Sequence, residues 1–225
     1  MKPHSQSTER PFSGPPIRIL IADDHALIRK GLKQVLACEF PQSEIGEASD
    51  AREALGLISN QCWDAILLDI TMPGQSGLDV LKQVKEMHPK TPVLVLSMHP
   101  EDQYAMRALK AGASGYLTKN TASELVATAL RKVLAGGTYV SQALAEDLAH
   151  RLNEPAANAP YETLSDREYQ IMSALALGKS VKEISFDLAL SVKTVSTYRT
   201  RLLRKLKLTT TAELIRYAIR EGLVQ

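Results

Sequence analysis

Five short apolar runs alternate with five stretches of helical pattern over the first 135 residues, and this alternation restricts the fold more than any other feature. The runs cover residues 17–22, 44–48, 64–68, 92–96 and 115–118, and the helical stretches lie near 26–38, 51–59, 77–87, 102–111 and 122–135. Strands that alternate with helices are joined by right-handed crossovers, so the pattern predicts a parallel sheet with helices on both faces. The continuous apolar run Val93–Leu96 agrees, because strands of such a sheet are buried on both sides.

Polar side chains follow four of the five runs. Asp23 and Asp24 follow the first run, Asp69 the third, Ser97 the fourth and Lys119 the fifth. The carboxyl ends of parallel strands meet at one edge of the sheet, and ligands bind outside that edge. Each residue alone has an ordinary explanation: Asp24 could cap a helix, Ser97 could be a turn residue and Lys119 a surface charge. Their joint placement instead predicts one site.

The residue types at this site indicate phosphoryl transfer. Neighbouring carboxylates repel one another and need a cation, and oxygen ligands suit Mg²⁺ better than zinc. A carboxylate can act as a nucleophile and form an aspartyl phosphate, and the transferred group needs positive charge on its oxygens. Asp69 would be the attacking group. Mg²⁺ would be held by Asp24, Asp69 and a backbone carbonyl near Thr71, with Asp23 acting through water. Lys119 would add a further positive charge, and Ser97 would donate a hydrogen bond to a phosphoryl oxygen.

The same five residues carry a family resemblance over about residues 17–135. Asp23-Asp24, Asp69 within DITMPG, Ser97 and Lys119 resemble, in order and spacing, the receiver domain of two-component response regulators. The resemblance implies a flavodoxin-like fold and phosphorylation of Asp69 by a sensor histidine kinase. It also implies that Ser97 and the aromatic residue of the fifth strand, here Tyr116, move together on phosphorylation.

A different composition begins after the fifth helical stretch. Gly136-Gly137 end that stretch, residues 141–152 predict another helix, and residues 153–160 (NEPAANAP) predict a flexible linker. Residues 161–225 hold 11 Lys and Arg against 7 Asp and Glu; the chain has 27 and 25, which leaves 16 and 18 for residues 1–160. A basic segment behind an acidic one predicts a nucleic-acid partner for the basic segment.

Residues 161–225 have the pattern of an all-helical domain. Three capping boxes mark helix starts: Ser165 with Glu168, Ser180 with Glu183, and Thr210 with Glu213. Residues 188–212 contain six basic residues and no acidic one. On a helical projection the buried stripe is Val192, Val195, Tyr198, Leu202 and Leu206. The outer face holds hydroxyl and basic side chains, which can contact base edges and phosphates: Lys193, Ser196, Thr197, Thr200, Arg201 and Arg204.

The helix at 180–188, the turn at 189–191 and the following basic helix form a helix-turn-helix candidate. Nearly all of residues 161–225 resemble the LuxR-type DNA-binding domain, so the whole chain resembles the NarL/FixJ class of response regulators. The resemblance implies a four-helix module that binds pseudo-palindromic duplex DNA as a homodimer. It implies base contacts from Ser196, Thr197 and Thr200, and phosphate contacts from Lys193, Thr194, Arg201 and Arg204. The last helix, near 212–221, would form the dimer seam through Leu214, Ile215, Ala218 and Ile219, which could also be core residues.

The remaining sequence features concern compartment. Residues 1–16 are polar and rich in Pro, which predicts a disordered leader, and no apolar run is long enough for a signal peptide or a membrane span. Cys38 and Cys62 fit no metal or redox spacing and are interpreted as free thiols of a cytoplasmic protein.

The sequence therefore predicts a phosphorylation-dependent transcription regulator. Its expected parts are an α/β receiver (17–135), a helical extension and linker (136–160), and an all-α DNA-binding domain (161–225). Two alternatives remain. The receiver could be a protein-interaction module that works without phosphorylation, although the complete set of five polar residues argues against this. The chain could also be a Mg²⁺-dependent phosphatase, although the segments between the strands are too short for a substrate-binding insertion.

Overall fold

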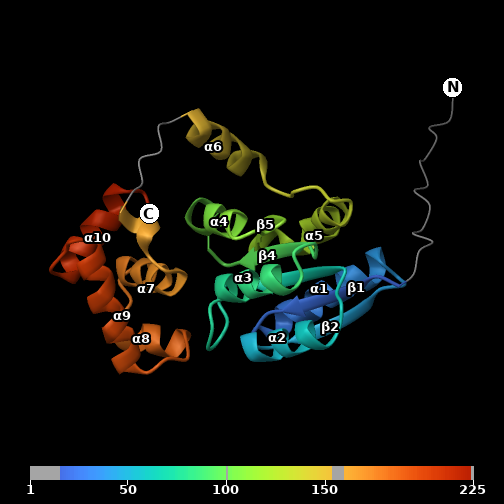
Figure 1. Cartoon of the computed structure of the whole chain (residues 1–225), viewed down its shortest axis with the longest axis horizontal. Coiled ribbons are helices and arrows are strands. Elements are labelled where there is room, and N and C mark those ends of the chain that lie inside the picture. Colours follow the sequence, from blue (N-terminus) through green and yellow to red (C-terminus); the bar gives the residue numbers. More distant parts are fainter. Residues whose placement is uncertain (1–15, 100, 154–159, 224–225) are drawn as a thin grey trace.

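The computed structural model describes residues 16–99, 101–153 and 160–223. The expected leader, apart from residue 16, and residues 154–159 of the expected linker lie outside this part of the chain. Figure 1 shows a sheet covered by helices at the N-terminal side and a separate group of helices at the C-terminal side.

Five strands form one parallel sheet in the order β2-β1-β3-β4-β5. They are β1 (Arg18–Ala22), β2 (Glu44–Ala48), β3 (Ala65–Asp69), β4 (Val93–Ser97) and β5 (Gly115–Thr118). β3 and β4 are buried along their whole length, as the continuous apolar runs predict. The order is that of the flavodoxin-like fold, which confirms the predicted α/β class.

Five helices cover the sheet on both faces. They are α1 (Ala26–Glu39), α2 (Ala51–Asn60), α3 (Gly77–Met87), α4 (Glu101–Lys110) and α5 (Lys119–Leu134). Leu36 of α1 and Val126 of α5 pack with Ile19 and Leu67 on one face, whereas α2, α3 and α4 bury their apolar residues on the other. α5 begins at Lys119, three residues earlier than the sequence pattern predicts, and Thr118 occupies the N-cap position without a side-chain capping hydrogen bond.

The C-terminal group is all-helical, as predicted. After α6 (Gln142–Asn153) and a 3₁₀ turn (Pro160–Thr163), it contains α7 (Asp166–Ala176), α8 (Val181–Asp187), α9 (Val192–Lys205) and α10 (Thr211–Arg220). All three predicted capping boxes are present. The turn between α8 and α9 requires a left-handed residue, and Ala189 adopts this conformation with φ of 49°. Across the described ranges, no helix has the length and apolar character needed to cross a membrane.

Candidate functional site

Asp69 ends β3 and lies fully buried at the carboxyl edge of the sheet. Its Oδ2 is 2.7 Å from Nζ of Lys119 at the start of α5, and its Oδ1 accepts a hydrogen bond of 3.0 Å from the backbone N–H of Thr71. Gly77 begins α3 so close to this strand that a Cβ atom would lie 2.0 Å from the Asp69 carbonyl oxygen. Only glycine fits there, so the loop from residue 70 to 76 returns tightly against the backbone of Asp69 and Ile70.

Asp23 and Asp24 stand on the neighbouring strand end and complete an acidic cluster. Asp23 is fully buried, and its Oδ2 lies 2.7 Å from Nζ of Lys119, which therefore bridges Asp23 and Asp69. Oδ2 of Asp23 has the Lys119 ammonium as its partner, and Oδ1 of Asp24 lies 2.6 Å from Nδ1 of His25. Carboxylates packed this closely fit a small divalent cation such as Mg²⁺.

Burial controls the ionisation of this cluster. Burial, together with repulsion from Asp23, raises the pKa of Asp69 to about 7, although Lys119 and the Thr71 N–H act in the opposite direction. Burial also acts to lower the pKa of Lys119, but attraction to Asp69 and Asp23 outweighs it, so that this pKa is raised. Lys119 thus stays charged, whereas near pH 7 the acceptor carboxylate is balanced between its two protonation states.

His25 also belongs to the cluster, although no sequence pattern singled it out. Its Nδ1 atom lies 2.6 Å from Oδ1 of Asp24 and 3.2 Å from Oδ1 of Asp23, and the four residues Asp23, Asp24, His25 and Asp69 offer ligand atoms within 4.8 Å of one another. The only signal in the sequence was adjacency to Asp24, which does not specify the direction of the side chain.

Ser97 and Tyr116 are joined through one loop residue. Ser97 ends β4, and its Oγ accepts a hydrogen bond of 3.0 Å from the backbone N–H of His99. The Tyr116 hydroxyl donates to the backbone carbonyl of the same His99 over 3.0 Å, and both side chains are fully buried. The two residues that the family resemblance pairs therefore hold the same loop from two sides.

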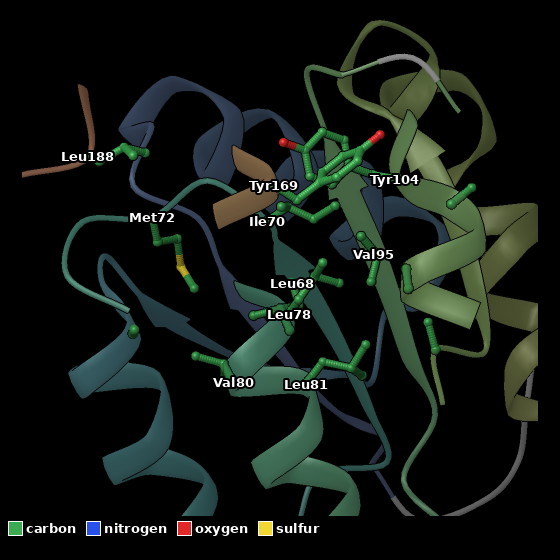
Figure 2. Packing of buried hydrophobic residues seen from close by; sticks show 14 of the residues in the cluster. Leu68, Ile70, Met72, Leu78, Val80, Leu81, Val95, Tyr104, Tyr169 and Leu188 are labelled. Carbon is green, nitrogen blue, oxygen red and sulfur yellow. The ribbon is translucent and has the colours of Figure 1, made fainter. Parts of the chain in front are cut away.

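The β4–α4 loop is linked to the C-terminal helices through Tyr104 of α4. The His99 ring lies 4.6 Å from the Tyr104 ring of α4, and Tyr104 meets Tyr169 of α7 edge-on at 5.1 Å. Figure 2 shows these two tyrosines side by side, with Ile70 of the Asp69 loop close to them. Apolar packing is thus continuous from the acidic site into the C-terminal domain.

Polar contacts strengthen this junction. Arg107 of α4 donates to the carbonyl oxygens of Tyr161 (2.7 Å) and Leu164 (3.0 Å), and its guanidinium lies 4.1 Å from the centre of the Tyr169 ring. Lys82 of α3 pairs with Asp166 over 2.6 Å.

Two side chains of α7 reach the loop that follows Asp69. Gln170 donates to the carbonyl of Ile70 over 3.3 Å, and Arg167 donates to the carbonyl of Gly74. α7 therefore contacts the loop after β3 directly and the loop after β4 through Tyr104 of α4. No sequence pattern pointed to these contacts, because each joins residues more than 90 positions apart.

The predicted DNA-contacting face of α9 is open. Lys193, Ser196, Thr197, Thr200, Arg201 and Arg204 are all exposed, and Thr194 is half-buried against the Ser191 cap. Two other basic residues have internal partners: Lys205 pairs with Glu168 over 2.6 Å and Arg199 donates to Thr211 over 2.8 Å. The assignment of Val192 to the buried stripe was wrong: this side chain is 47% exposed because it starts the helix beyond the packing surface.

The four residues expected at a dimer seam separate into two pairs. Leu214 and Ala218 are fully buried in the core of the C-terminal domain. Ile215 is half-buried and Ile219 is 59% exposed. In this conformation only Ile215 and Ile219 are accessible to a second copy.

Both parts of the chain match known protein families. Residues 19–131 match the response regulator receiver domain, and residues 162–218 match the LuxR family of bacterial regulatory proteins. The chain is 37% identical over 209 residues to the response regulator GacA of Pseudomonas aeruginosa, covering 92% of this chain and 98% of GacA. It is 36% identical over 208 residues to the response regulator UvrY of Escherichia coli, covering 92% and 95%. A structure of the Salmonella typhimurium response regulator RcsB shares the fold with a TM-score of 0.67 at 23% identity, covering 94% of this chain and all of that one.

Proposed function

The chain belongs to the two-component response regulators that join a receiver domain to a LuxR-type DNA-binding domain, and on this premise we propose that Asp69 is the phosphoryl acceptor that controls DNA binding. The observation that carries the proposal is the position of Lys119, whose ammonium group lies 2.7 Å from both Asp69 and the neighbouring Asp23. A carboxylate that is buried beside a fixed positive charge and next to an acidic cluster suits phosphoryl transfer.

The phosphoryl donor would be a phosphohistidine of a sensor kinase. An oxygen of Asp69 attacks phosphorus while the P–N bond breaks, and the departing imidazole takes a proton. Mg²⁺ would be held by Asp24, Asp69 and the Thr71 carbonyl, with Asp23 acting through water, and when bound it supplies positive charge opposite the phosphoryl oxygens. Lys119 would pair with one of those oxygens.

Ser97 and Tyr116 would convert the new phosphoryl group into a change of the β4–α4 loop. In the structure the Ser97 hydroxyl accepts the His99 N–H. Turning this hydroxyl toward a phosphoryl oxygen would break that bond and free the loop that Tyr116 also holds. Because His99 packs on Tyr104, and Tyr104 on Tyr169 of α7, the movement would weaken the junction with the DNA-binding domain.

The α9 face would read the duplex. Ser196, Thr197 and Thr200 would contact bases, whereas Lys193, Thr194, Arg201 and Arg204 would contact phosphates. The absence of acidic residues from α9 supports this role, because carboxylates would be repelled by the DNA backbone. The protein would bind promoter DNA in the cytoplasm.

The exposure of the α9 face determines which step of DNA binding the proposed switch can control. Since the face is exposed while α7 is docked, docking would not prevent contact with one half-site. A homodimer, however, must set its two recognition helices about 34 Å apart, one turn of DNA. Rigid docking of α7 would hinder that spacing, and release of α7 would allow it, with Ile215 and Ile219 meeting across the dimer seam.

We also propose that the functional units are residues 17–135 as the receiver, 136–160 as a helical extension and linker, and 161–225 as the DNA-binding domain. The matched ranges 19–131 and 162–218 support this division. It would allow the last unit to move as a body when the α7 contacts break.

In-vitro selection of random duplexes, with and without Mg²⁺ and a small acyl-phosphate donor, tests the switch. The expected result is a two-fold-symmetric motif that is enriched only with the donor and not with Asp69→Asn. Duplexes with one half-site should bind equally well with and without the donor. Equal enrichment of the full motif in both arms would support the phosphorylation-independent alternative, and steady hydrolysis of an added phosphoester would support the phosphatase alternative.

A further inference from the structure

We propose that Gln170 of α7 is a positioning residue for phosphoryl transfer to Asp69, so that the DNA-binding domain prepares the receiver for the reaction. The inference rests on the proposed role of Asp69 as the phosphoryl acceptor, and it adds to that site a residue from the other domain. Gln170 lies 100 positions from Ile70 in the chain, yet its side-chain amide donates to the Ile70 carbonyl over 3.3 Å. Ile70 directly follows the acceptor, so the contact reaches the first residue of the Asp69 loop.

The Ile70 carbonyl and the Thr71 N–H belong to the same peptide unit. That unit is planar and trans, so its C=O and its N–H point in opposite directions and turn together. On one side, Gln170 and the Gly77 N–H (2.9 Å) hold the C=O. On the other side, the Thr71 N–H donates to Oδ1 of Asp69 over 3.0 Å. A side chain of α7 therefore helps to set the direction of the N–H that orients the acceptor carboxylate.

The orientation of this carboxylate matters for the reaction. Thr71 holds its Oδ1 and Lys119 holds its Oδ2 over 2.7 Å, so the plane of the group is fixed before a donor arrives. Each oxygen has two lone pairs, which leaves one free for attack. That lone pair must be aimed at phosphorus, in line with the bond that breaks. A misplacement of about 1 Å can cost about 100-fold in rate, so a contact that fixes the plane should accelerate phosphoryl transfer.

Arg167 holds Gln170 in the orientation that this role requires. The Arg167 guanidinium donates to the side-chain carbonyl of Gln170 over 2.9 Å, which directs the amide NH₂ group toward Ile70. It also donates to the backbone carbonyl of Gly74, further along the same loop. Both side chains are buried, and burying polar groups costs free energy that apolar side chains would not. Packing of α7 alone does not account for this pair, whereas fixing the loop beside Asp69 does.

The rate at which acetyl phosphate phosphorylates the full-length protein, followed on phosphate-affinity gels in saturating Mg²⁺, tests the inference. An oxygen of Asp69 attacks phosphorus, the P–O bond to acetate breaks, and acetate leaves with the electron pair. Gln170→Met keeps the length of the side chain and removes the donor. It should lower the maximal rate about five- to tenfold, less than free misplacement would, because Gly77 still holds the carbonyl. The donor concentration for half the maximal rate should stay within about twofold, since a positioning residue does not bind the donor.

Two further variants separate positioning from packing. Gln170→Glu can still accept from Arg167 but cannot donate to Ile70, so it should show the same loss of maximal rate. Ser173→Ala is the matched control, because Ser173 is equally buried on α7 and lies beside Tyr104. It should react as the wild type does. Trp63 fluorescence shows that the receiver of each variant is folded.

Amide NMR of the unphosphorylated protein gives a readout that needs no turnover. A weaker hydrogen bond to Oδ1 of Asp69 moves the Thr71 amide proton upfield, so both Gln170 variants should show this shift and Ser173→Ala should not. An unchanged Thr71 signal together with a wild-type maximal rate would overturn the positioning role. A higher half-saturating donor concentration at an unchanged maximal rate would also overturn it, because Gln170 would then control access of the donor. A wild type that takes up no phosphoryl group would instead reject the proposed function, and the inference with it.

Discussion

The charge on Asp69 should make the receiver less stable at alkaline pH, and Asp69→Asn should remove this effect. Burial raises the pKa of Asp69 from 3.8 to about 7. A folded-state pKa above the unfolded one means that the contribution to stability is fully present below about pH 4 and is lost as pH rises through about 7. Each pKa unit corresponds to about 1.4 kcal/mol, so ionisation of Asp69 lowers the free energy of unfolding by at most about 4 kcal/mol.

Asn has nearly the shape of a protonated Asp and cannot ionise. In the absence of divalent cations, Asp69→Asn should therefore raise the free energy of unfolding by roughly 1.5 kcal/mol at pH 5 and by up to about 4 kcal/mol at pH 8. Mg²⁺ should stabilise the wild type at pH 8, because an ion that binds only the folded state shifts the unfolding equilibrium. The variant should gain much less from Mg²⁺, because it lacks one carboxylate of the proposed site.

Urea unfolding followed by tryptophan fluorescence measures this directly. Trp63 is the single tryptophan of the chain and is buried beside the receiver sheet, so its emission reports unfolding of that domain. Glu124→Gln, which changes an exposed carboxylate of α5, is the control and should behave as the wild type does. If the free energy of unfolding changed equally between pH 5 and pH 8 in the wild type and in Asp69→Asn, the argument that burial disfavours the ionised Asp69 would be refuted.

Three further predictions concern the DNA-binding domain. Arg107→Ala should raise the affinity for a duplex with two half-sites about tenfold without a phosphoryl donor, because it removes two hydrogen bonds to backbone carbonyls and the stacking on Tyr169; an unchanged affinity in a gel-shift titration would contradict the proposed junction. Thr200→Ala should change the DNA sequence preferred in a selection experiment. Arg204→Ala should instead weaken binding to all duplexes alike and reduce the salt dependence of binding by about one counterion. The reverse outcome would exchange the roles of the two residues. Ile219→Ala should weaken binding to two half-sites and leave binding to one half-site unchanged, as measured by fluorescence anisotropy; equal loss on both duplexes would mean that Ile219 supports the fold of the domain and not the dimer.

The carboxyl-edge site was predictable from the sequence because it depends on topology. Once five apolar runs are interpreted as parallel strands, the residues after them must meet at one edge, and Asp23, Asp69 and Lys119 do so. The capping boxes were equally accessible, since each joins residues only three positions apart. Features set by local spacing or by strand order therefore follow from the chain alone.

Side-chain direction and long-range docking did not follow from the sequence. The approach of the His25 ring to the carboxylates depends on a rotamer that no pattern specifies. Val192 has the period of a buried residue, yet it lies in the first turn of α9 and its side chain is 47% exposed. Gln170 looks like a helix-surface residue, and only the packing of α7 against the loop after β3 reveals its contact with Ile70.

The position of α7 explains how a small chemical event could affect a distant surface. α7 touches the loop that follows Asp69 through Gln170 and Arg167, and its Tyr169 packs on Tyr104 of α4, which in turn packs on His99 of the loop that follows Ser97. A phosphoryl group at Asp69 would disturb both loops at once, so two sets of contacts would weaken together. A loss of only about 1.4 kcal/mol is a tenfold change in the ratio of docked to released protein. By linkage, whatever favours release of α7 must also favour the phosphorylated receiver, so a duplex that captures two released domains should raise the equilibrium fraction of phosphorylated Asp69 at a given level of donor.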